Sequence, residues 1–379
     1  MNLRAYQSAE ERRIALEKEL KKQFSHVSNF SFDESIVSTK NCENLIGATH
    51  IPLGVAGPLK VESQKSKVKN YFIPLATTEG ALVASISRGC KVVTESGGVS
   101  VFIERSGMTR GPVFATGSLK KGKEVTLWIK KNITRLEKIA QTTSSHIMLT
   151  DIMIRPVGEY LFVRFSFDTQ DAMGMNMVTI ATEKLVAEIS NATKIDCISV
   201  AGNFDIDKKP AWLNVINNRG FVASADIVIT KELVKKNLKT TSEKIFDVWL
   251  AKCMIGSAMS GSLGFNAHFA NIIAALFLAT GQDPAHVVEG SLGITTIKVL
   301  KNGDLYVSIY LPALLVGTVG GGTHLATQQE SLALLGVSTS EALAEVVAGT
   351  VLAGELSLLA SLAEGTLAKA HKKLGRGIK

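Results

Sequence analysis

Hydrophobic and polar positions follow two different periods along the chain, and the periods divide it into segments. Glu and Lys or Arg recur at helical spacing over residues 8–24, which predicts an amphipathic helix that packs on the body of the protein. Strict alternation over 159–167, EYLFVRFSF, predicts a strand. Other periodic stretches predict helices over 172–190 and 252–280, a strand over 305–315 and a helix with one apolar face over 341–373.

Proline and glycine punctuate the remaining stretches. They predict strands and turns over 43–59, and the polar residues 62–70 are a hairpin candidate. Thr77 or Thr78 can cap a helix that runs from Glu79 through Arg88, with Gly89 near its C-terminal end. GTVGGGT, residues 317–323, reads as a glycine turn before another helix.

The pattern of predicted strands and helices changes at about residue 111 and changes back at about residue 199. Strand, acidic turn and helix follow one another between these points, so we expect a smaller α+β domain inserted into a larger helix-rich α/β domain. The expected divisions are an N-terminal helical segment (1–40), a large domain (41–111 and 200–379) and the inserted domain (112–199).

Composition narrows the function classes. The chain has 379 residues, a formal charge of +8 and 6% aromatic residues, and its lysine clusters are scattered. A nucleic-acid groove needs basic and aromatic side chains together, so a polyanionic small molecule or an ordinary solvated surface fits better. Ile272–Thr280 is too short to span a bilayer and the N-terminus has no signal core, so we expect a soluble cytoplasmic protein.

The cysteines argue against a metal centre. Their spacing contains no CxxC pair, so neither a zinc site nor a disulfide framework is indicated. We expect Cys42, Cys90, Cys197 and Cys253 to be reduced and buried, and we expect no bound metal.

The stretch GNFDIDKKPAWLN, residues 202–214, is the first candidate for chemistry. Pro210 disfavours helix at Lys209, so Lys208 and Lys209 lie on a turn or extended loop after Asp207. Two adjacent ammonium groups on such a loop suit an anion or a developing oxyanion. The alternative is a solvated loop with a nearby counter-ion.

DAMGMNM, residues 171–177, is the second candidate, because it lies where a strand passes into a helix. Asp171 can serve as N-cap, and Gly174 lets a pyrophosphate approach the free N–H groups of the first turn. The alternative is that its methionines fill the core. Asp168, at the end of the strand, can accept hydrogen bonds from a ribose diol, or it is a solvated turn residue.

Further polar residues are each weak signals alone. Glu79 is either a partly buried proton donor or a carboxylate that favours a helix N-terminus. Asp283 can cap a helix, His371 lies near a lysine-rich tail, and GTVGGGT can cradle a phosphate or ease helix packing.

Taken together, these segments resemble the 3-hydroxy-3-methylglutaryl-coenzyme A (HMG-CoA) reductase family. The resemblance is carried in the family's order, mainly over residues 40–371, by ENLIGATHIPLGVAGPL, PLATTEGALVASISRGC, GMTRGP, DAMGMNM, GNFDIDKKPA, GSAMSGSLGFNAHFANI, GQD, GTVGGGTHL and AGELSLLASLAEG. The DKKP form is similar to the class shared by eukaryotes and many archaea. The resemblance implies reductive deacylation of HMG-CoA to mevalonate, on the route to isoprenoids, with two reduced nicotinamides and release of coenzyme A.

The resemblance also implies roles for individual residues. Lys208 would stabilise the oxyanion, His371 would protonate the departing thiolate, Glu79 would protonate the aldehyde oxygen, and Asp283 would couple Lys208 to Glu79. The positions matching substrate contacts are Ser85, Arg88, Arg110, Asp207, Lys209, Lys252, His268 and Asn271. Those matching the coenzyme site are Ser144, Ser145, Asp168, Asp171, Met173, Gly174, Met175, Asn176, Met177, Gly320 and Gly321.

The implied architecture is a thioester domain with an inserted ferredoxin-like domain for the dinucleotide. The active sites would lie at the interface of a homodimer, and the tail with His371 would close as a flap. The family's default coenzyme is NADPH. Here Asp168 occupies the place of an arginine that suits a 2′-phosphate, and His146 after Ser145 replaces a second arginine, which favours NADH.

Other departures and competing functions complete these expectations. Ala201 replaces a serine that touches the substrate, no membrane anchor precedes the catalytic part, and the tail lacks a regulatory serine near Gly377. An acyl-coenzyme A transferase or a lysine Schiff-base enzyme could also use Lys208, and a basic RNA-binding protein is the non-enzymatic alternative.

Overall fold

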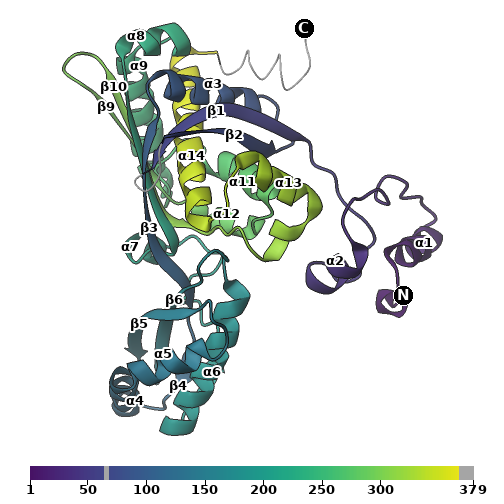
Figure 1. Cartoon of the computed structure of the whole chain (residues 1–379). Coiled ribbons are helices and arrows are strands. Elements are labelled where there is room, and N and C mark those ends of the chain that lie inside the picture. The colour runs from purple at the N-terminus through teal and green to yellow at the C-terminus, as the bar shows by residue number, and fades with distance from the viewer. Residues whose placement is uncertain (64–67, 367–379) are drawn as a thin grey trace.

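Two bodies joined through a long strand make up the computed structural model of the chain (Figure 1), which describes residues 1–63 and 68–366. Each body has its own hydrophobic core. Together they form a mixed α+β fold, as the sequence pattern predicts. His371, Gly377 and the expected flap lie outside the described residues.

A six-stranded sheet in the order β2-β1-β3-β8-β10-β9 supports the larger body. Its neighbours run antiparallel except for the parallel pair β1 and β3. The strands are β1 (Leu53–Ser63), β2 (Lys69–Ala76), β3 (Val99–Arg110), β8 (Gly220–Ile229), β9 (Ile294–Val299) and β10 (Leu305–Leu314).

Helix α14 (Ser340–Glu364) runs through the core of this body (Figure 1) and packs on α3 (Leu82–Glu95), α9 (Ser242–Trp249), α11 (Phe269–Thr280) and the sheet. Its side chains are buried on every side, so the expected one-sided apolar helix is wrong. Helix α14 ends at Glu364, and the expected part of the helix from 367 to 373 lies outside the described residues. Among the described residues it is long and apolar enough to cross a membrane, yet 78% of its most apolar window is buried inside the protein. It is therefore a core helix.

Helix α3 (Leu82–Glu95) begins later than Glu79, because Ala81 adopts a left-handed conformation (φ 75°) and stops the helix there. Thr77 holds the preceding turn through its Oγ1, which accepts from the N–H of Glu79 at 3.0 Å. Gly89 lies inside the helix and not at its end. A Cβ there would meet the carbonyl oxygen of Ala353 at 1.9 Å, so Gly89 allows α3 and α14 to touch backbone to backbone.

The smaller body contains, in chain order, strand, helices, strand, strand, helix and strand. Its sheet order is β7-β4-β6-β5, the order of a ferredoxin-like unit. The elements are β4 (Val113–Ala115), α4 (Leu119–Lys131), α5 (Ile133–Gln141), β5 (Met148–Val157), β6 (Tyr160–Asp168), α6 (Met175–Thr193) and β7 (Asp196–Ser199). The exact domain limits stay a prediction.

Strand β3 belongs to both sheets. Residues 100–107 pair with β8 in the larger body, and Met108–Arg110 pair with Phe165–Phe167 of β6 in the smaller one. The ladder is therefore continuous across the junction.

The expected long helix over 252–280 is interrupted. A π-helical segment (Leu250–Gly256) passes into α10 (Ser257–Ser260), and left-handed Gly261 (φ 67°) ends it before a loop that leads to α11. The remaining short elements are α7 (Trp212–Ile216), α8 (Lys231–Leu233), α12 (Val287–Gly290), α13 (Ala326–Leu335) and a π-helical turn (Val234–Leu238).

The N-terminal segment lies to one side of the larger body (Figure 1). Helix α1 (Ala9–Leu20) starts with a capping box between Ser8 and Glu11, and α2 (Glu34–Lys40) follows. Ala9, Val37 and Leu45 form a small cluster of their own, against which Leu325 packs. The expectation of an amphipathic helix on the body is therefore only partly right: Ala9 and Arg12 are the buried residues of α1.

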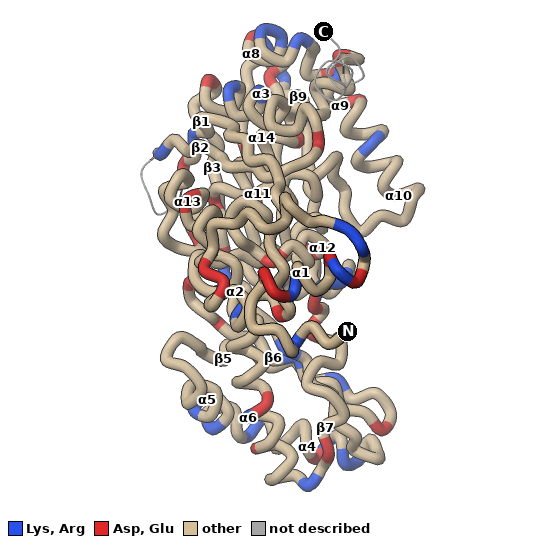
Figure 2. Tube along the Cα trace, turned by 90° about the vertical axis from the view of Figure 1, so that its right-hand side faces the viewer, with Lys and Arg blue, Asp and Glu red and all other residues tan. Residues whose placement is uncertain are grey.

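Lys and Arg lie on many separate elements of both bodies and are interleaved with Asp and Glu (Figure 2). The cysteines differ from expectation. Cys90 and Cys253 are buried, and burial raises the pKa of each thiol to about 12, whereas Cys42 is exposed and Cys197 is half-buried.

Candidate active site

The DKKP loop lies between the two bodies, after β7 and before α7. Lys208 has a positive φ of 55°, which is uncommon for a residue with a side chain. Its N–H donates to Glu289 Oε1 at 2.5 Å, and its Nζ lies 2.8 Å from Asp283 Oδ2. The structure thus brings together the lysine and the aspartate that the sequence analysis paired.

Asp283 caps the short 3₁₀ turn Pro284–His286, and its Oδ1 accepts from the N–H of Ala285 at 3.0 Å. Burial is the largest single influence and raises its pKa, but the hydrogen bonds from Lys208 and Ala285 together with the charges of His286 and Lys208 outweigh burial, so the pKa lies below its ordinary value of 3.8. Asp283 is therefore a carboxylate near neutral pH and a stable partner for an ammonium group.

Asp207 and Arg110 tie this loop to the smaller body. Arg110 Nη1 lies 3.2 Å from Asp205 and 3.8 Å from Asp207, and its guanidinium also donates to Thr179 on α6. Lys209 is exposed, and its Nζ donates to Asp207 O at 3.2 Å. Arg110 and Asp207 thus have structural partners in addition to their predicted substrate role.

A pocket of about 880 Å³ opens beside the DKKP loop. Pro210 forms one wall, and Lys252 and His268 line it from the larger body. Asn271 lies one turn into α11 from His268. Lys252 and His268, two predicted substrate residues on different elements, therefore line one cavity, and Asn271 lies one turn from it.

Glu355, fully buried on α14, holds one wall of this pocket. Its carboxylate accepts from the N–H groups of Ala267 and His268 at 2.8 and 2.6 Å and from Thr295 Oγ1. The His268 Nε2 lies 2.9 Å from Gly354 O. Sequence reasoning missed Glu355; the only signal was an acid inside an apolar helix.

Ser85 and Arg88 lie on α3 and contact the C-terminal half of α14. Ser85 Oγ is 2.9 Å from Ser357 Oγ, and Arg88 donates to Ser357 and to Ser361. Burial lowers the pKa of Arg88, and the nearby Glu364 opposes that shift. Both side chains are therefore placed next to the helix that leads toward His371.

DAMGMNM packs against GTVGGGT although the two are far apart in sequence. Thr318 N donates to Asp171 O at 2.8 Å, and a Cβ on Gly317 would meet Met173 N at 2.4 Å. Gly320 and Gly321 are exposed, and a Cβ on either would find open space. The glycine turn therefore serves packing at Gly317 and leaves an open surface at its tip.

Asp171 does not cap its own helix, as the sequence analysis expected. Its Oδ1 accepts from Ser340 N at 2.8 Å and Ser340 Oγ at 3.1 Å, at the start of α14. Helix α6 follows left-handed Gly174 with no side-chain cap, so its first N–H groups are free for a ligand. Met173, Met175 and Met177 pack against the smaller core, as the alternative interpretation expected, while Asn176 is exposed.

A second pocket of about 360 Å³ lies on the smaller body. Ser144, Ser145, His146 and Asp168 line it. Asp168 forms an ion pair with Arg105 at 3.3 Å. The structure therefore gathers the residues predicted to face the adenosine ribose.

Glu79 and Ala201 need separate comment. Glu79 is exposed, because the turn before α3 leaves it at the surface, so the first of its two interpretations, a partly buried carboxylate, does not hold in the single chain. Among the described residues it forms no ion pair with Lys208. Ala201 is exposed as well, and Ser199 Oγ contacts its backbone at 3.1 and 3.2 Å.

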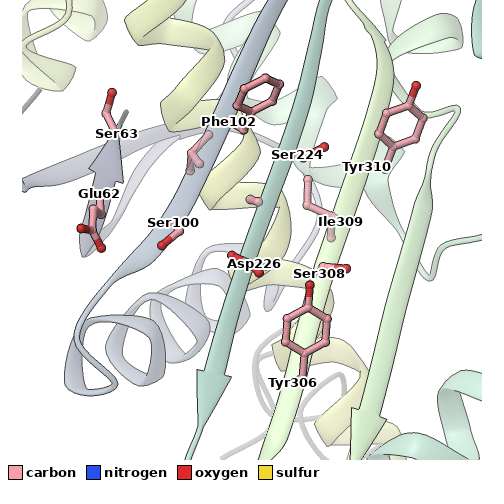
Figure 3. A pocket seen from close by; sticks show the side chains of 12 residues that line it. Glu62, Ser63, Ser100, Phe102, Ser224, Asp226, Tyr306, Ser308, Ile309 and Tyr310 are labelled. Carbon is pink, nitrogen blue, oxygen red and sulfur yellow. The ribbon is translucent and has the colours of Figure 1, made fainter. Parts of the chain in front are cut away.

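The open face of the larger sheet carries a third hollow of about 580 Å³ (Figure 3). Glu62 and Asp226 contribute carboxylates to it, and among the described residues its lining contains no Lys, Arg or His. Such a surface repels a polyanion, so this hollow is a poor candidate for coenzyme A or a dinucleotide.

Comparison with known proteins identifies the family that this chain matches. The model of the hydroxymethylglutaryl-coenzyme A reductase family matches residues 8–376. The chain is 50% identical to 3-hydroxy-3-methylglutaryl-coenzyme A reductase of Methanocaldococcus jannaschii, covering 97% of this chain and 93% of that protein. It is 46% identical to the reductase of Aeropyrum pernix, covering 98% and 90%.

A solved structure shows the same fold. The class II reductase of Streptococcus pneumoniae, bound to NADPH in open conformations, superposes with a TM-score of 0.70 at 20% identity, covering 93% of this chain and 92% of that one. The family match over nearly the whole chain, together with the lysine–aspartate pair beside the large pocket, leads to one conclusion: this chain belongs to the HMG-CoA reductase family.

Proposed function

We propose that this protein reduces HMG-CoA to mevalonate and free coenzyme A at the pocket beside the DKKP loop, with Lys208 as the group that stabilises the oxyanion. The observation that carries the site assignment is the 2.8 Å contact between Lys208 Nζ and Asp283 Oδ2. A charged ammonium, 39% exposed and held by a carboxylate, is placed to meet negative charge that develops in the adjoining pocket.

The reaction needs two reductions and two proton transfers. The nicotinamide coenzyme supplies one hydride to the thioester carbonyl and, from a second molecule, one to the aldehyde carbon. Lys208 donates a hydrogen bond to the oxygen that becomes negative when the carbonyl carbon becomes tetrahedral. The C–S bond then breaks, and the thiolate takes a proton, a step we assign to His371, which lies outside the described residues.

Glu79 is the proposed proton donor for the aldehyde oxygen. It is exposed in the single chain, where a carboxyl group has no shelter from water. We propose that the site is completed in a homodimer, in which a second subunit covers Glu79 and places it near Lys208. We also place the enzyme in the cytoplasm.

Substrate binding follows from the charges around the large pocket. Lys252 and Lys209 are exposed cations, and His268 and Asn271 add hydrogen-bonding groups. Ammonium and guanidinium groups suit the carboxylate of HMG and the phosphates of coenzyme A. Arg88, beside the end of α14, is the proposed contact for the phosphates of coenzyme A.

The coenzyme would bind the smaller body, with the first turn of α6 facing its pyrophosphate and the pocket of Asp168 facing its adenosine ribose. We propose a preference for NADH. Asp168 can accept from the ribose hydroxyls and would repel a 2′-phosphate. Arg105 is already paired with Asp168 at 3.3 Å, so the positive charge of Arg105 is compensated.

The first experiment measures loss of reduced-nicotinamide absorbance when HMG-CoA is added, with NADH and with NADPH. We expect turnover in the wild type, no measurable turnover in Lys208→Ala, and normal turnover in Lys301→Ala, which removes an exposed lysine elsewhere. An active Lys208→Ala enzyme would refute the role of Lys208. No turnover with either coenzyme would also exclude the reductase activity and favour a transferase or Schiff-base enzyme.

The second experiment tests coenzyme choice through kcat/KM for both coenzymes. Asp168→Arg should move the ratio toward NADPH by about tenfold or more, because it removes a negative charge and adds a phosphate partner. Glu159→Arg, a charge reversal on an exposed turn of the same body, should leave the ratio unchanged. A wild-type enzyme that strongly prefers NADPH would refute the proposal.

A further inference from the structure

A buried group of charges lies directly behind Lys208 and Asp283. Arg219 is 0% exposed, and its guanidinium pairs with Glu289 at 2.8 Å and with Asp207 at 3.0 Å. Glu289 is also 0% exposed, and the same Oε1 that binds Arg219 accepts from the N–H of Lys208. The backbone of the proposed catalytic lysine is therefore fixed by a buried carboxylate from another element.

His286 is the third member of this group and is fully buried. Its Nδ1 lies 3.3 Å from Glu289 Oε2. Its Nε2 faces two more carboxylates, at 3.8 Å from Asp283 and 4.0 Å from Asp207. Within the described part of the chain this Nε2 has no hydrogen-bond partner. A buried ring nitrogen that faces two carboxylates and has no hydrogen-bond partner is able to donate to either of them.

The charges of this group balance only when His286 is protonated. The groups joined by ion pairs are three cations and four carboxylates: Lys208, Arg110 and Arg219 with Asp205, Asp207, Asp283 and Glu289. Arg164 forms none of these ion pairs, and its charge interacts with Asp151 and Asp205 alike. An uncompensated buried negative charge is costly, and an imidazolium removes it.

The proposed reaction creates a specific need for that charge. When the substrate oxygen becomes negative, Lys208 must turn toward it and weaken its contact with Asp283. Asp283 would then lose its nearest cation inside a partly buried site. His286 is the neighbouring group that can replace it, because its free Nε2 already faces the same Oδ2 that Lys208 binds.

We propose that His286, held as an imidazolium by Glu289 and Asp207, takes over Asp283 during turnover and so releases Lys208 to the oxyanion. Arg219 and Glu289 are positioning residues that fix the backbone of Lys208. This inference rests on the proposed role of Lys208. It differs from a metal site in the same group, because Arg219 already occupies one oxygen of Asp207 and one of Glu289.

The charged groups that face His286 are Asp283 on its own turn, Asp207 on the DKKP loop and Glu289 on α12. Lys208 and Arg219 bind the same three carboxylates. The carboxylates favour a protonated ring, and the two cations oppose it. The proposal requires turnover to fall when His286 loses its proton.

Steady-state kinetics of His286→Gln across pH 6–10 test the proposal. Gln keeps a hydrogen-bonding amide and loses the charge. We expect kcat to fall by about tenfold or more with KM changed less than about threefold, because the lost interaction is needed in the transition state. The decline of kcat at high pH that His286 causes should also disappear. His26→Gln, an exposed histidine in the N-terminal segment, should behave as wild type.

A measurement on the wild type keeps the test independent of folding. Histidine side-chain NMR, assigned by the signal missing in His286→Gln, should show an imidazolium at pH 7. A neutral ring at pH 7, or an unchanged kcat and pH profile in a folded His286→Gln enzyme, would overturn the inference. If instead Lys208→Ala is active, the proposed role of Lys208 fails first.

Discussion

Gly89 is the position where one added methyl group should damage this enzyme most. In an ordinary helix, replacing glycine by alanine stabilises by about 1 kcal/mol through helix propensity. At Gly89 the new Cβ would lie 1.9 Å from the carbonyl oxygen of Ala353 and 2.5 Å from its carbonyl carbon. Both atoms belong to the backbone of a helix buried on all sides, so they cannot rotate away.

The magnitude follows from that geometry. Real Cβ contacts stay beyond 3.0 Å, so α3 and α14 must separate by about 1 Å in a core that has no free space. Overpacking of this kind costs about 1–3 kcal/mol or more, which exceeds the propensity gain. Gly89→Ala should therefore lower the urea midpoint, measured by circular dichroism at fixed protein concentration.

A matched control separates the two effects. Gly122 lies inside α4, and its Cβ would meet Thr116 Oγ1 at 3.4 Å, an ordinary contact. Gly122→Ala should therefore keep or raise the midpoint. Gly89→Ala should also raise the KM for HMG-CoA, because Ser85 and Arg88 bind α14 across the same crossing. A midpoint for Gly89→Ala equal to or above that of wild type would refute the reasoning.

Three further predictions concern separate parts of the structure. Iodoacetamide at pH 8 should label exposed Cys42 in the folded protein and leave Cys90 unlabelled, because burial raises the pKa of Cys90 to about 12; mass spectrometry of the labelled peptides decides this. Gly317→Ala should weaken coenzyme binding in fluorescence titrations, since its Cβ would lie 2.4 Å from Met173 N; unchanged binding would contradict the packing role. The wild type should gain stability over Asp283→Asn above about pH 4 and lose that gain as the pH falls through the lowered pKa of Asp283, as urea midpoints at pH 3 and 6 would show.

Local pattern predicted the elements whose surroundings are simple. The alternation over 159–167 agrees with β6 within one residue at each end. Most side chains of that strand are buried within the smaller body. The run 305–315 agrees with β10 equally well. In both cases the periodicity of the sequence reflects one sheet and its immediate cover.

The prediction of one apolar face for α14 is wrong because it assumes that one side of the helix is exposed to solvent. Strands and helices from both halves of the larger body surround it, so small and apolar residues occur at every position, and periodicity disappears. The interruption before α11 is not visible in the periodicity, which predicts one helix over 252–280, whereas left-handed Gly261 ends the helical segment there.

The site was predictable where the family resemblance names the residues. Lys208 and Asp283 were paired through the family resemblance, and the structure places their charged groups in contact. The partners of Asp171 and Lys208 could not be predicted. Asp171 binds Ser340, 169 positions away, and Lys208 binds Glu289, 81 positions away. Local capping rules consider only neighbours in sequence, so they cannot predict a hydrogen-bond partner that only the tertiary fold brings near.

The order in which the chain is synthesised gives the central position of α14 a further meaning. The smaller body is one contiguous stretch from β4 to β7, so it can fold soon after it leaves the ribosome. β1, β2 and α3 are made earlier still, but the helix that fills their core is the last element described. The apolar surface of α3 and β1 that α14 covers therefore stays exposed until residues 340–364 have emerged, and we expect nascent chains that stop before residue 340 to depend on chaperones.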